Sequence, residues 1–386
     1  MSGGSRWPAW FDPDDDRLAR AAWSRLAEPG DEEAWGFVAE HGAGVALRLL
    51  ADSGGRVSPR WWVRWAHTDP RRDLRVVERF GGRWIVPGDA QWPLRLDDLQ
   101  QRRPFGLWVR GPLDPADACA RSVAVVGARA ATYYGRDLAA GIATGCADAG
   151  YTTVSGGAYG IDAAAHRAAL AVDGVTVAVL ACGIDRAYPR GNERLLEQIA
   201  EVGCLVSEVP PGSAPTRWRF LERNRLIAAL TAGTVVVEAG WRSGAQNTAR
   251  HALGLGRPLG ACPGPVTSAL SAGCHRLLRE GAVCVCDAGE VLELVAPIGE
   301  QLTLDPDLTP TVLDALRPEQ RRVYEALPVR TPAGMDSVAR HAGLEPRAVE
   351  RILARLAALD LAEQSGGRWL RGAGKPAREP SGRPAR

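Results

Sequence analysis

The strongest constraint on the fold is a regular alternation of short, valine-rich runs with longer helical stretches between residues 122 and 296. The runs typical of buried strands are SVAVVG, YTTVSGG, VTVAVLACG, CLVSEV, TVVVEA, PLGACPG and AVCVCD. Stretches such as GRDLAAGIATGCADAG and NERLLEQIAEVG separate them and have helical spacing. Strands that alternate with helices of this length predict right-handed crossovers, and therefore an α/β fold with an extended, Rossmann-like, doubly wound and mostly parallel sheet.

The segments on either side predict further domains, as expected for 386 residues. Residues 13–83 have acidic capping residues and short helical repeats, which predict a small helical module ahead of a core over 84–296. Residues 297–314 have the composition of a linker, and residues 315–371 predict three helices and a hairpin, the layout of a winged helix. Residues 372–386 lack periodicity and are expected to be a disordered tail.

Composition limits the classes of function. The net charge is only +2, so any nucleic-acid site must come from local clustering of basic residues, nearly all of which are arginine. The eight cysteines contain no CxxC pair and lie mostly in apolar runs, which predicts buried free thiols in a reducing cytosol and no zinc site. We find no signal peptide and no membrane-spanning run, and expect a cytoplasmic protein.

A basic cluster with interleaved aromatic residues lies in the stretch PTRWRFLERNRLIAALTAGTVVVEAGWRSG, residues 215–244. Such a cluster can neutralise phosphates and offer flat faces to unstacked bases. The alternative is a solvated, arginine-rich turn beside an ordinary core strand. The residues concerned are Arg217, Trp218, Arg219, Phe220, Arg223 and Arg225, with Arg242, Ser243 and Gly244 at the turn after the strand.

Glycine-rich turns end several of the predicted strands on the same edge of the sheet, where open α/β folds bind ligands. The first carries Arg129, and the second contains Gly156 and Gly157 before a helix start, where free backbone N–H groups favour an anion. No GxGxxG fingerprint, serine elbow or paired carboxylates occur. His166 is expected to be a packed histidine rather than a general base.

Carboxylates near this edge are spread over four strands, which favours a binding surface over an active site, and we expect no catalytic residue. They are Asp162, Asp185, Glu208 and Glu238.

These motifs together resemble the DNA-processing protein A family, also called DprA or Smf. The matching text is VAVVGAR, VSGGAYGIDAAAHRAAL, GIDRAYPRGNERL, SEVPPGSAP, FLERNRLIAAL, VVVEAGWRSGAQNTARHALGLGRP and CPGPVTSALSAGCHRLLREGA. It covers about residues 85–295 in matching order and spacing. The helical module, of the SAM-like type, and the winged helix also occupy the places that such modules take in that family.

The resemblance implies a single-stranded DNA-binding protein without known catalytic turnover, metal or cofactor. Proteins of this family protect incoming single strands during natural transformation, load the RecA recombinase onto them, and commonly act as homodimers. Carried over by position, Arg129, Arg217 and Arg225 would contact phosphates and Phe220 would stack a base, with Gly156, Gly157, Ser243 and Gly244 giving further contacts.

This chain departs from the family pattern at Tyr159, where the family usually has an arginine; the tyrosine could stack on a base instead. Trp218 is a possible second stacking face, and Arg219, Arg223 and Arg242 are possible additional contacts.

Two other functions stay open from the sequence. One is a nucleotide-hydrolysing enzyme of the lysine-decarboxylase-like (LOG) group, although the chain has EAGWRSGAQNTAR where that group has PGGxGTxxE. The other is a transcription regulator that acts through the winged helix, whose third helix carries Arg347, Arg351 and Arg355 along one face.

Overall fold

The computed structural model describes residues 7–297, 316–329 and 331–372. The chain divides into two compact units, residues 1–303 and 304–386. Apart from residues 297 and 372, the predicted linker and the predicted tail lie outside the described residues.

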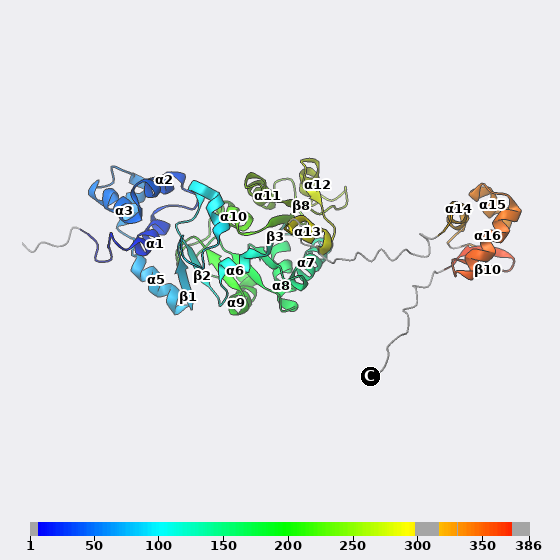
Figure 1. The fold of residues 1–386 in the computed structure, drawn as a ribbon, viewed down its shortest axis with the longest axis horizontal. Helices are drawn as coiled ribbons and strands as arrows, with labels where there is room; N and C mark the ends of the chain where they lie inside the picture. Colours follow the sequence, from blue (N-terminus) through cyan, green and yellow to red (C-terminus); the bar gives the residue numbers. More distant parts are fainter. Residues whose placement is uncertain (1–6, 298–315, 330, 373–386) are drawn as a thin grey trace, which may run out of the picture. The chain divides into compact units, whose positions relative to one another are not determined.

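The first unit contains a nine-stranded sheet with the order β1-β2-β6-β5-β4-β3-β7-β8-β9 (Figure 1). From β6 to β9 all neighbours are parallel, as predicted. The sheet is nevertheless mixed, because β1 and β2 join β6 as an antiparallel edge. The strands are β1 (Gly82–Ile85), β2 (Leu107–Arg110), β3 (Ser122–Val126), β4 (Thr152–Ser155), β5 (Thr176–Val179), β6 (Cys204–Ser207), β7 (Gly233–Val236), β8 (Leu259–Ala261) and β9 (Val283–Cys284).

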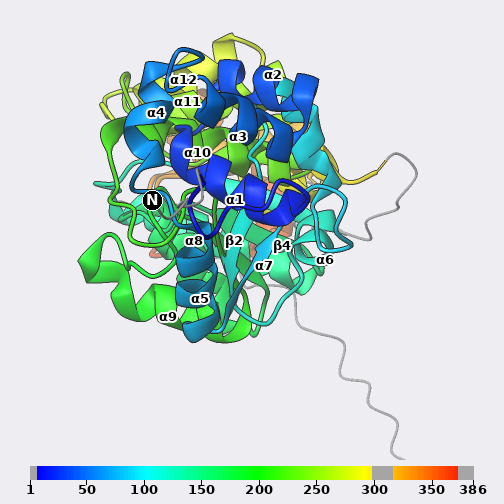
Figure 2. The ribbon, with the colours of Figure 1, turned by 90° about the vertical axis from the view of Figure 1, so that its left-hand side faces the viewer.

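Helices cover both faces of this sheet, which is why the central strands are buried throughout (Figures 1 and 2). In β3, Val123 and Val125 enter one hydrophobic core, and Ala124 and Val126 enter the core on the opposite face. One face carries α7 (Tyr133–Asp148), α8 (Ile161–Ala171), α9 (Glu193–Val202) and α13 (Ala288–Val295), and the other carries α10 (Arg217–Leu230), α11 (Ala245–Gly254) and α12 (Ala272–Arg279). The shorter connecting helices are η1 (Leu94–Arg102), α6 (Pro115–Ala120) and η2 (Arg190–Asn192).

The sheet reverses its winding at β3. The chain runs from β3 through β4 and β5 to β6, and then returns through α10 to β7 on the other side of β3. The loops that follow β3 and β7 therefore diverge, which leaves a crevice at their carboxyl ends.

A helical module precedes the sheet and packs against its antiparallel edge (Figure 2). Its first two helices begin at predicted acidic caps, where Asp15 accepts a hydrogen bond from Leu18 N and Asp31 accepts one from Ala34 N. The rings of Trp84 in β1 and Trp108 in β2 lie 4.2 Å apart in this contact. The helices are α1 (Asp16–Leu26), α2 (Glu32–His41), α3 (Ala43–Asp52), α4 (Pro59–Trp65) and α5 (Pro70–Arg79).

The second unit has three helices followed by an antiparallel hairpin, the order of elements expected for residues 315–371. Its core includes Val338, Val349 and Leu353, while Arg347 and Arg351 are exposed on the third helix. The winged-helix assignment stays a prediction. The elements are α14 (Pro318–Ala326), α15 (Met335–Ala342), α16 (Pro346–Ala358), β10 (Ala362–Ser365) and β11 (Arg368–Arg371).

The cysteines are free thiols, and six of the eight are buried as predicted. Cys284 and Cys286 are exposed: Cys284 lies in β9, the edge strand of the sheet, and Cys286 lies two residues beyond it. Among the described residues there is no cluster of His, Cys, Asp or Glu that could hold a metal ion. Within the same ranges, no helix has both the length and the apolar character needed to cross a membrane.

Candidate nucleic-acid interface

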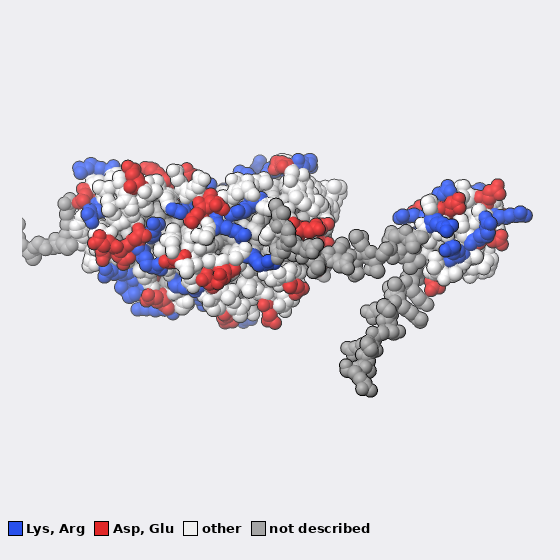
Figure 3. Space-filling view, in the orientation of Figure 1, with Lys and Arg blue, Asp and Glu red and all other residues white. Residues whose placement is uncertain are grey.

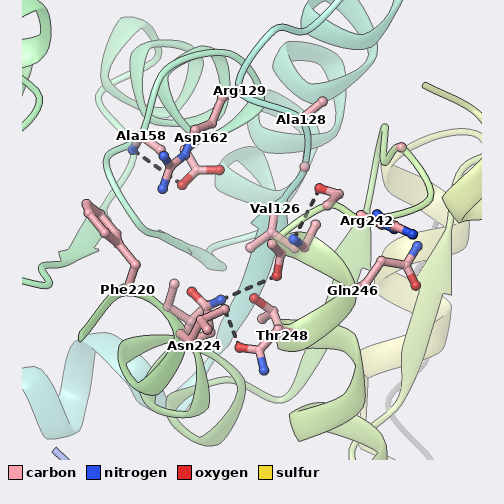
Figure 4. Close-up of a pocket in the computed structure, with 18 of the residues that line it drawn as sticks. Val126, Ala128, Arg129, Ala158, Asp162, Phe220, Asn224, Arg242, Gln246 and Thr248 are labelled. Atoms are coloured by element: carbon pink, nitrogen blue, oxygen red, sulfur yellow. Dashed lines mark hydrogen bonds between the residues drawn. The ribbon is translucent and has the colours of Figure 1, made fainter. Parts of the chain in front are cut away.

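A cleft with a volume of about 1070 Å³ lies at the crevice between β3 and β7 (Figure 4). Its walls are the β3–α7 loop, the start of α8, the first half of α10 and the β7–α11 turn. Asp162 is the one carboxylate among the described residues that line it. The lining arginines are Arg129, Arg217, Arg223, Arg242, Arg250 and Arg276.

The loop that carries Arg129 is held by backbone bonds on both sides. Ala128 N donates to Glu238 O at 2.7 Å, and Ile161 N donates to Ala128 O at 3.2 Å. The Glu238 carboxylate also accepts bonds from Thr132 N at 2.9 Å and Thr132 Oγ1 at 2.6 Å. Arg129 therefore projects from a fixed backbone, and its side chain is exposed.

Phe220 stands in the first turns of α10 with its ring half-buried on the cleft wall (Figure 4). The guanidinium carbon of Arg129 lies 4.8 Å from the ring centroid, and the Tyr188 ring lies 5.6 Å away at a tilt. A cation over an aromatic face favours this arrangement and positions both side chains. The predicted stacking residue and the predicted phosphate-binding arginine are thus neighbours.

The next part of α10 is buried on all sides, and its RNR segment connects three parts of the sheet. Arg223 Nη1 donates to Val179 O in β5 at 3.0 Å. Asn224 Nδ2 donates to Gly244 O at 3.3 Å and to Asn247 Oδ1 at 3.0 Å, so it holds the β7–α11 turn (Figure 4). Arg225 binds Glu208 just beyond β6.

Arg223 forms the floor of the cleft together with Asp162. Burial lowers the pKa of Arg223 to about 10, and the charge of Asp162 acts against that shift. Burial also raises the pKa of Asp162, although Arg223 and the N–H groups of Ala158 and Gly156 act in the other direction. Asp162 Oδ2 accepts these two N–H groups at 3.3 and 3.1 Å. At neutral pH the floor therefore keeps a buried positive charge, since a pKa near 10 leaves Arg223 protonated.

The β7–α11 turn forms the opposite wall (Figure 4). It contributes Arg242, Ser243 and Gly244, as predicted, and Ser243 Oγ accepts a hydrogen bond from Ala245 N at 3.3 Å. Trp241 lines the cleft as well, with 56% of its surface exposed and the Arg276 guanidinium 5.4 Å from its ring. Sequence reasoning missed Trp241; an aromatic residue next to a glycine at a strand end was the available signal.

Six of the predicted contact residues do not line the cleft. Gly156 and Gly157 are buried behind it, and the N–H of Gly156 already donates to Asp162. Arg219 is bound to Glu28 of the helical module. Tyr159 and Trp218 are exposed outside the cleft, with the Tyr159 hydroxyl accepting a bond from Gly191 N.

Arg225, the sixth, is fully buried and has no surface to offer a phosphate. Its donors are taken by Glu208 and by the carbonyls of Arg102 and Glu222. The expectation that Arg225 lies on the cleft wall is therefore not met, because a buried carboxylate binds it.

The other carboxylates near the strand ends bind the chain's own donors. Asp185 accepts Gly212 N, Glu208 accepts Arg225, and Glu238 accepts Thr132. His166 is buried as predicted, with Nδ1 2.7 Å from Thr176 Oγ1, and burial lowers its pKa to about 3.

Comparison with known proteins matches this core to one family. Residues 83–296, more than half of the chain, match the model of the DNA recombination-mediator protein A family. The chain belongs to this family. The resemblance to DNA-processing protein A is thereby confirmed.

With individual relatives, the similarity is longer than the core. A Mycobacterium tuberculosis protein that carries the name DNA processing protein DprA is 49% identical over 320 residues, which cover 78% of this chain and 82% of that protein. The DNA processing protein DprA of Streptococcus pneumoniae is 36% identical over 260 residues, covering 66% and 90%.

Solved structures also match. The X-ray structure of DprA from Streptococcus pneumoniae has a TM-score of 0.61 at 34% identity, and the match covers 72% of this chain and 97% of that one. The α/β fold is thus shared with a solved DprA. A DNA processing protein A from Helicobacter pylori, described for its single-stranded DNA binding mode, has a TM-score of 0.49 at 29% identity, covering 54% and 94%.

Proposed function

We propose that this DprA-family protein binds single-stranded DNA in the cleft between β3 and β7. Phosphates would lie against Arg129, Arg217 and Arg242, and an unpaired base would stack on Phe220. The observation that carries the proposal is the half-exposed ring of Phe220 beside Arg129 on the cleft wall.

The free charge of the cleft supports phosphate binding. Arg129, Arg217 and Arg242 are exposed, and none forms an ion pair with another residue that the structure describes. The whole chain carries a net charge of only +2, so attraction for a polyanion must come from this local concentration of arginine.

Two aromatic residues on opposite walls support a preference for single strands. Phe220 belongs to α10, and Trp241 follows β7. Bases in a duplex are already stacked and hidden, whereas each base of a single strand has a free face for an aromatic ring. The bases would therefore interact with the cleft only when they are unpaired.

Family membership supports a proposal for the wider role. We propose that the protein protects incoming single strands and loads RecA onto them during natural transformation or recombination, acting as a homodimer in the cytoplasm. An enzymatic role of the lysine-decarboxylase-like kind is not favoured, because Asp162, Glu208 and Glu238 are held by the chain's own donors.

The test is fluorescence anisotropy of a labelled single strand and its duplex over a salt series. Tighter binding of the single strand with a steep salt dependence would support the cleft. Equal or stronger duplex binding would instead favour a regulator that acts through residues 315–371. Absence of binding to both would contradict the proposal, and mononucleotides would then be tested as enzyme ligands.

A further inference from the structure

A stripe of arginine residues runs along α5 of the helical module. Arg71, Arg75 and Arg79 are spaced four residues apart, so they lie along one face of the helix. All three are exposed, and none forms an ion pair with another residue in the described ranges. Figure 3 shows basic side chains gathered over α5, at the lower left of the first unit.

The opposite face of α5 holds the helix in place without using these charges. Val77 is buried in the core that joins the module to the sheet. Asp73 is also turned inward, and its Oδ1 lies 2.6 Å from Arg25 Nη2. Glu78 is the only exposed carboxylate of α5.

The stripe differs from most of the module's arginines in its regular spacing along one helix. Several others are bound to carboxylates, as in the pairs Arg17–Asp89, Arg20–Asp16, Arg60–Asp31 and Arg64–Glu28. Arg48, Arg56 and Arg72 are exposed and also form no ion pair with a residue in the described ranges, but they do not extend the four-residue row. Like charges at four-residue spacing on a helix repel one another. A row of unpaired arginines therefore weakens the free helix and suits a polyanionic ligand.

An exposed aromatic residue stands at the end of the stripe. Phe80 follows Arg79 directly and has 46% of its surface exposed. The Arg110 guanidinium of β2 lies 6.0 Å from its ring centroid. Arginines beside an exposed ring repeat the chemistry of the cleft, where Arg129 lies beside Phe220.

A chain of contacts links α5 to the cleft. Arg25 Nη2 donates both to Asp73 of α5 and to Pro211 O at 3.0 Å. Pro211 begins the loop that ends at Thr216, the N-cap of α10, and Arg217 of the cleft follows immediately. A groove of about 320 Å³ lies along this loop, and its lining includes Arg25, Arg64, Arg219 and Glu28. Glu28 forms ion pairs with Arg64 and Arg219.

We propose that the α5 stripe binds the sugar-phosphate backbone of a single strand that leaves the cleft past the loop of residues 211–216. The inference rests on the proposed function of the cleft and extends the binding path onto the helical module. Arg71, Arg75 and Arg79 supply the phosphate contacts, and Phe80 supplies a stacking face. The stripe matters only for strands long enough to reach it.

The test compares a triple variant (Arg71→Gln, Arg75→Gln and Arg79→Gln) with a matched triple variant of α16 (Arg347→Gln, Arg351→Gln and Arg355→Gln), which removes the same charge at the same spacing. Anisotropy is measured with single strands of about 6 and about 30 nucleotides, lengths chosen on either side of common groove site sizes. Circular dichroism checks that each variant is folded.

The α5 variant should bind the short strand like the parent and the long strand at least tenfold more weakly. The salt slope for the long strand should fall by about 2, from three lost phosphate contacts at about 0.7 each. Unchanged long-strand binding by the α5 variant, or an equal loss of binding in the α16 variant, would overturn the inference. Neither result would contradict the proposed binding of DNA in the cleft. A parent protein that bound neither strand would refute the proposed function and this inference with it.

Discussion

Arg225 and Glu208 form a buried bidentate ion pair, in which Arg225 Nη1 lies 2.6 Å from Glu208 Oε1 and Arg225 Nη2 lies 2.6 Å from Glu208 Oε2. Their side chains are 1% and 7% exposed. Arg225 Nε also donates to Arg102 O at 2.8 Å. The pair therefore fixes the middle of α10, the helix that carries Phe220 and Arg217 into the cleft.

Replacing Arg225 with alanine should destabilise the first unit by about 3–5 kcal/mol, because Glu208 would stay buried without a partner. Chemical denaturation measures this loss. Arg129→Ala is the control: it removes an exposed arginine, so it should change stability by less than about 0.5 kcal/mol while weakening single-strand binding. A stable Arg225→Ala protein that had lost DNA binding would restore a direct phosphate contact for Arg225.

The contrast between these two arginines shows what sequence reasoning can reach here. The strands, their order along the chain and the position of the cleft at strand ends follow from local patterns, since valine runs and glycine turns are readable one segment at a time. The pairing of Arg225 with Glu208 joins residues 17 positions apart and depends on how α10 crosses the sheet. Arginine residues in one short segment consequently look alike in sequence and differ in burial.

The placement of β1 and β2 in the sheet likewise depends on tertiary structure. Their short apolar runs are typical of strands, but only tertiary packing decides that they extend the parallel sheet as an antiparallel edge. The burial of Trp84 against Trp108 stabilises that edge, and the helical module packs on the same two rings through Ala21 and Val77. Local propensity contains no information about this choice.

Removing the stacking faces should weaken single-strand binding in two separate steps. Phe220→Ala should cost about 1–3 kcal/mol for its stacked base, and Trp241→Ala should cost a similar amount if the opposite wall also holds a base. Anisotropy on both single variants and the double variant separates the two rings. Trp218→Ala is the control, because Trp218 is equally exposed at 56% but lies outside the cleft. Full binding by Phe220→Ala would contradict the stacking role.

Gly156→Ala should disturb the floor of the cleft. A Cβ at this position would lie 1.6 Å from Arg223 Nη1, so the guanidinium would have to leave its place against Val179 O. We expect a loss of stability of about 1–3 kcal/mol together with weaker DNA binding. Thermal unfolding and anisotropy on the same preparation measure both.

Gly244→Ala is the matched case on the cleft wall, since a Cβ there meets no atom within 4 Å and its φ of −60° suits alanine. Its stability should equal that of the parent, and weaker DNA binding would reveal a close backbone approach to phosphate. If Gly156→Ala kept both properties, the position of Arg223 on the cleft floor would be irrelevant to binding.

The contact between Glu28 and Arg219 should make stability depend on acid pH. Burial alone would raise the pKa of Glu28, but the hydrogen bond and charge of Arg219 and the charge of Arg64 outweigh it, so the pKa lies below its usual 4.5. A carboxyl group with a lower pKa in the folded state stabilises that state above its unfolded pKa. The contribution is lost as the pH falls through the folded pKa.

Glu28→Gln should therefore lower the free energy of unfolding at pH 7 by about 1 kcal/mol, a small value because the Glu28 side chain is 33% exposed and partly screened. Urea unfolding of the parent and the variant at several pH values should show this difference shrinking below about pH 4.5, where the unfolded carboxyl group becomes protonated. A difference that stayed constant down to pH 3 would mean that Glu28 acts by packing rather than by charge. Arg219 directly precedes Phe220 in the first turn of α10, and neighbouring residues of a helix point to different faces. The same variant therefore also tests whether anchoring α10 to the helical module through Arg219 supports DNA binding in the cleft.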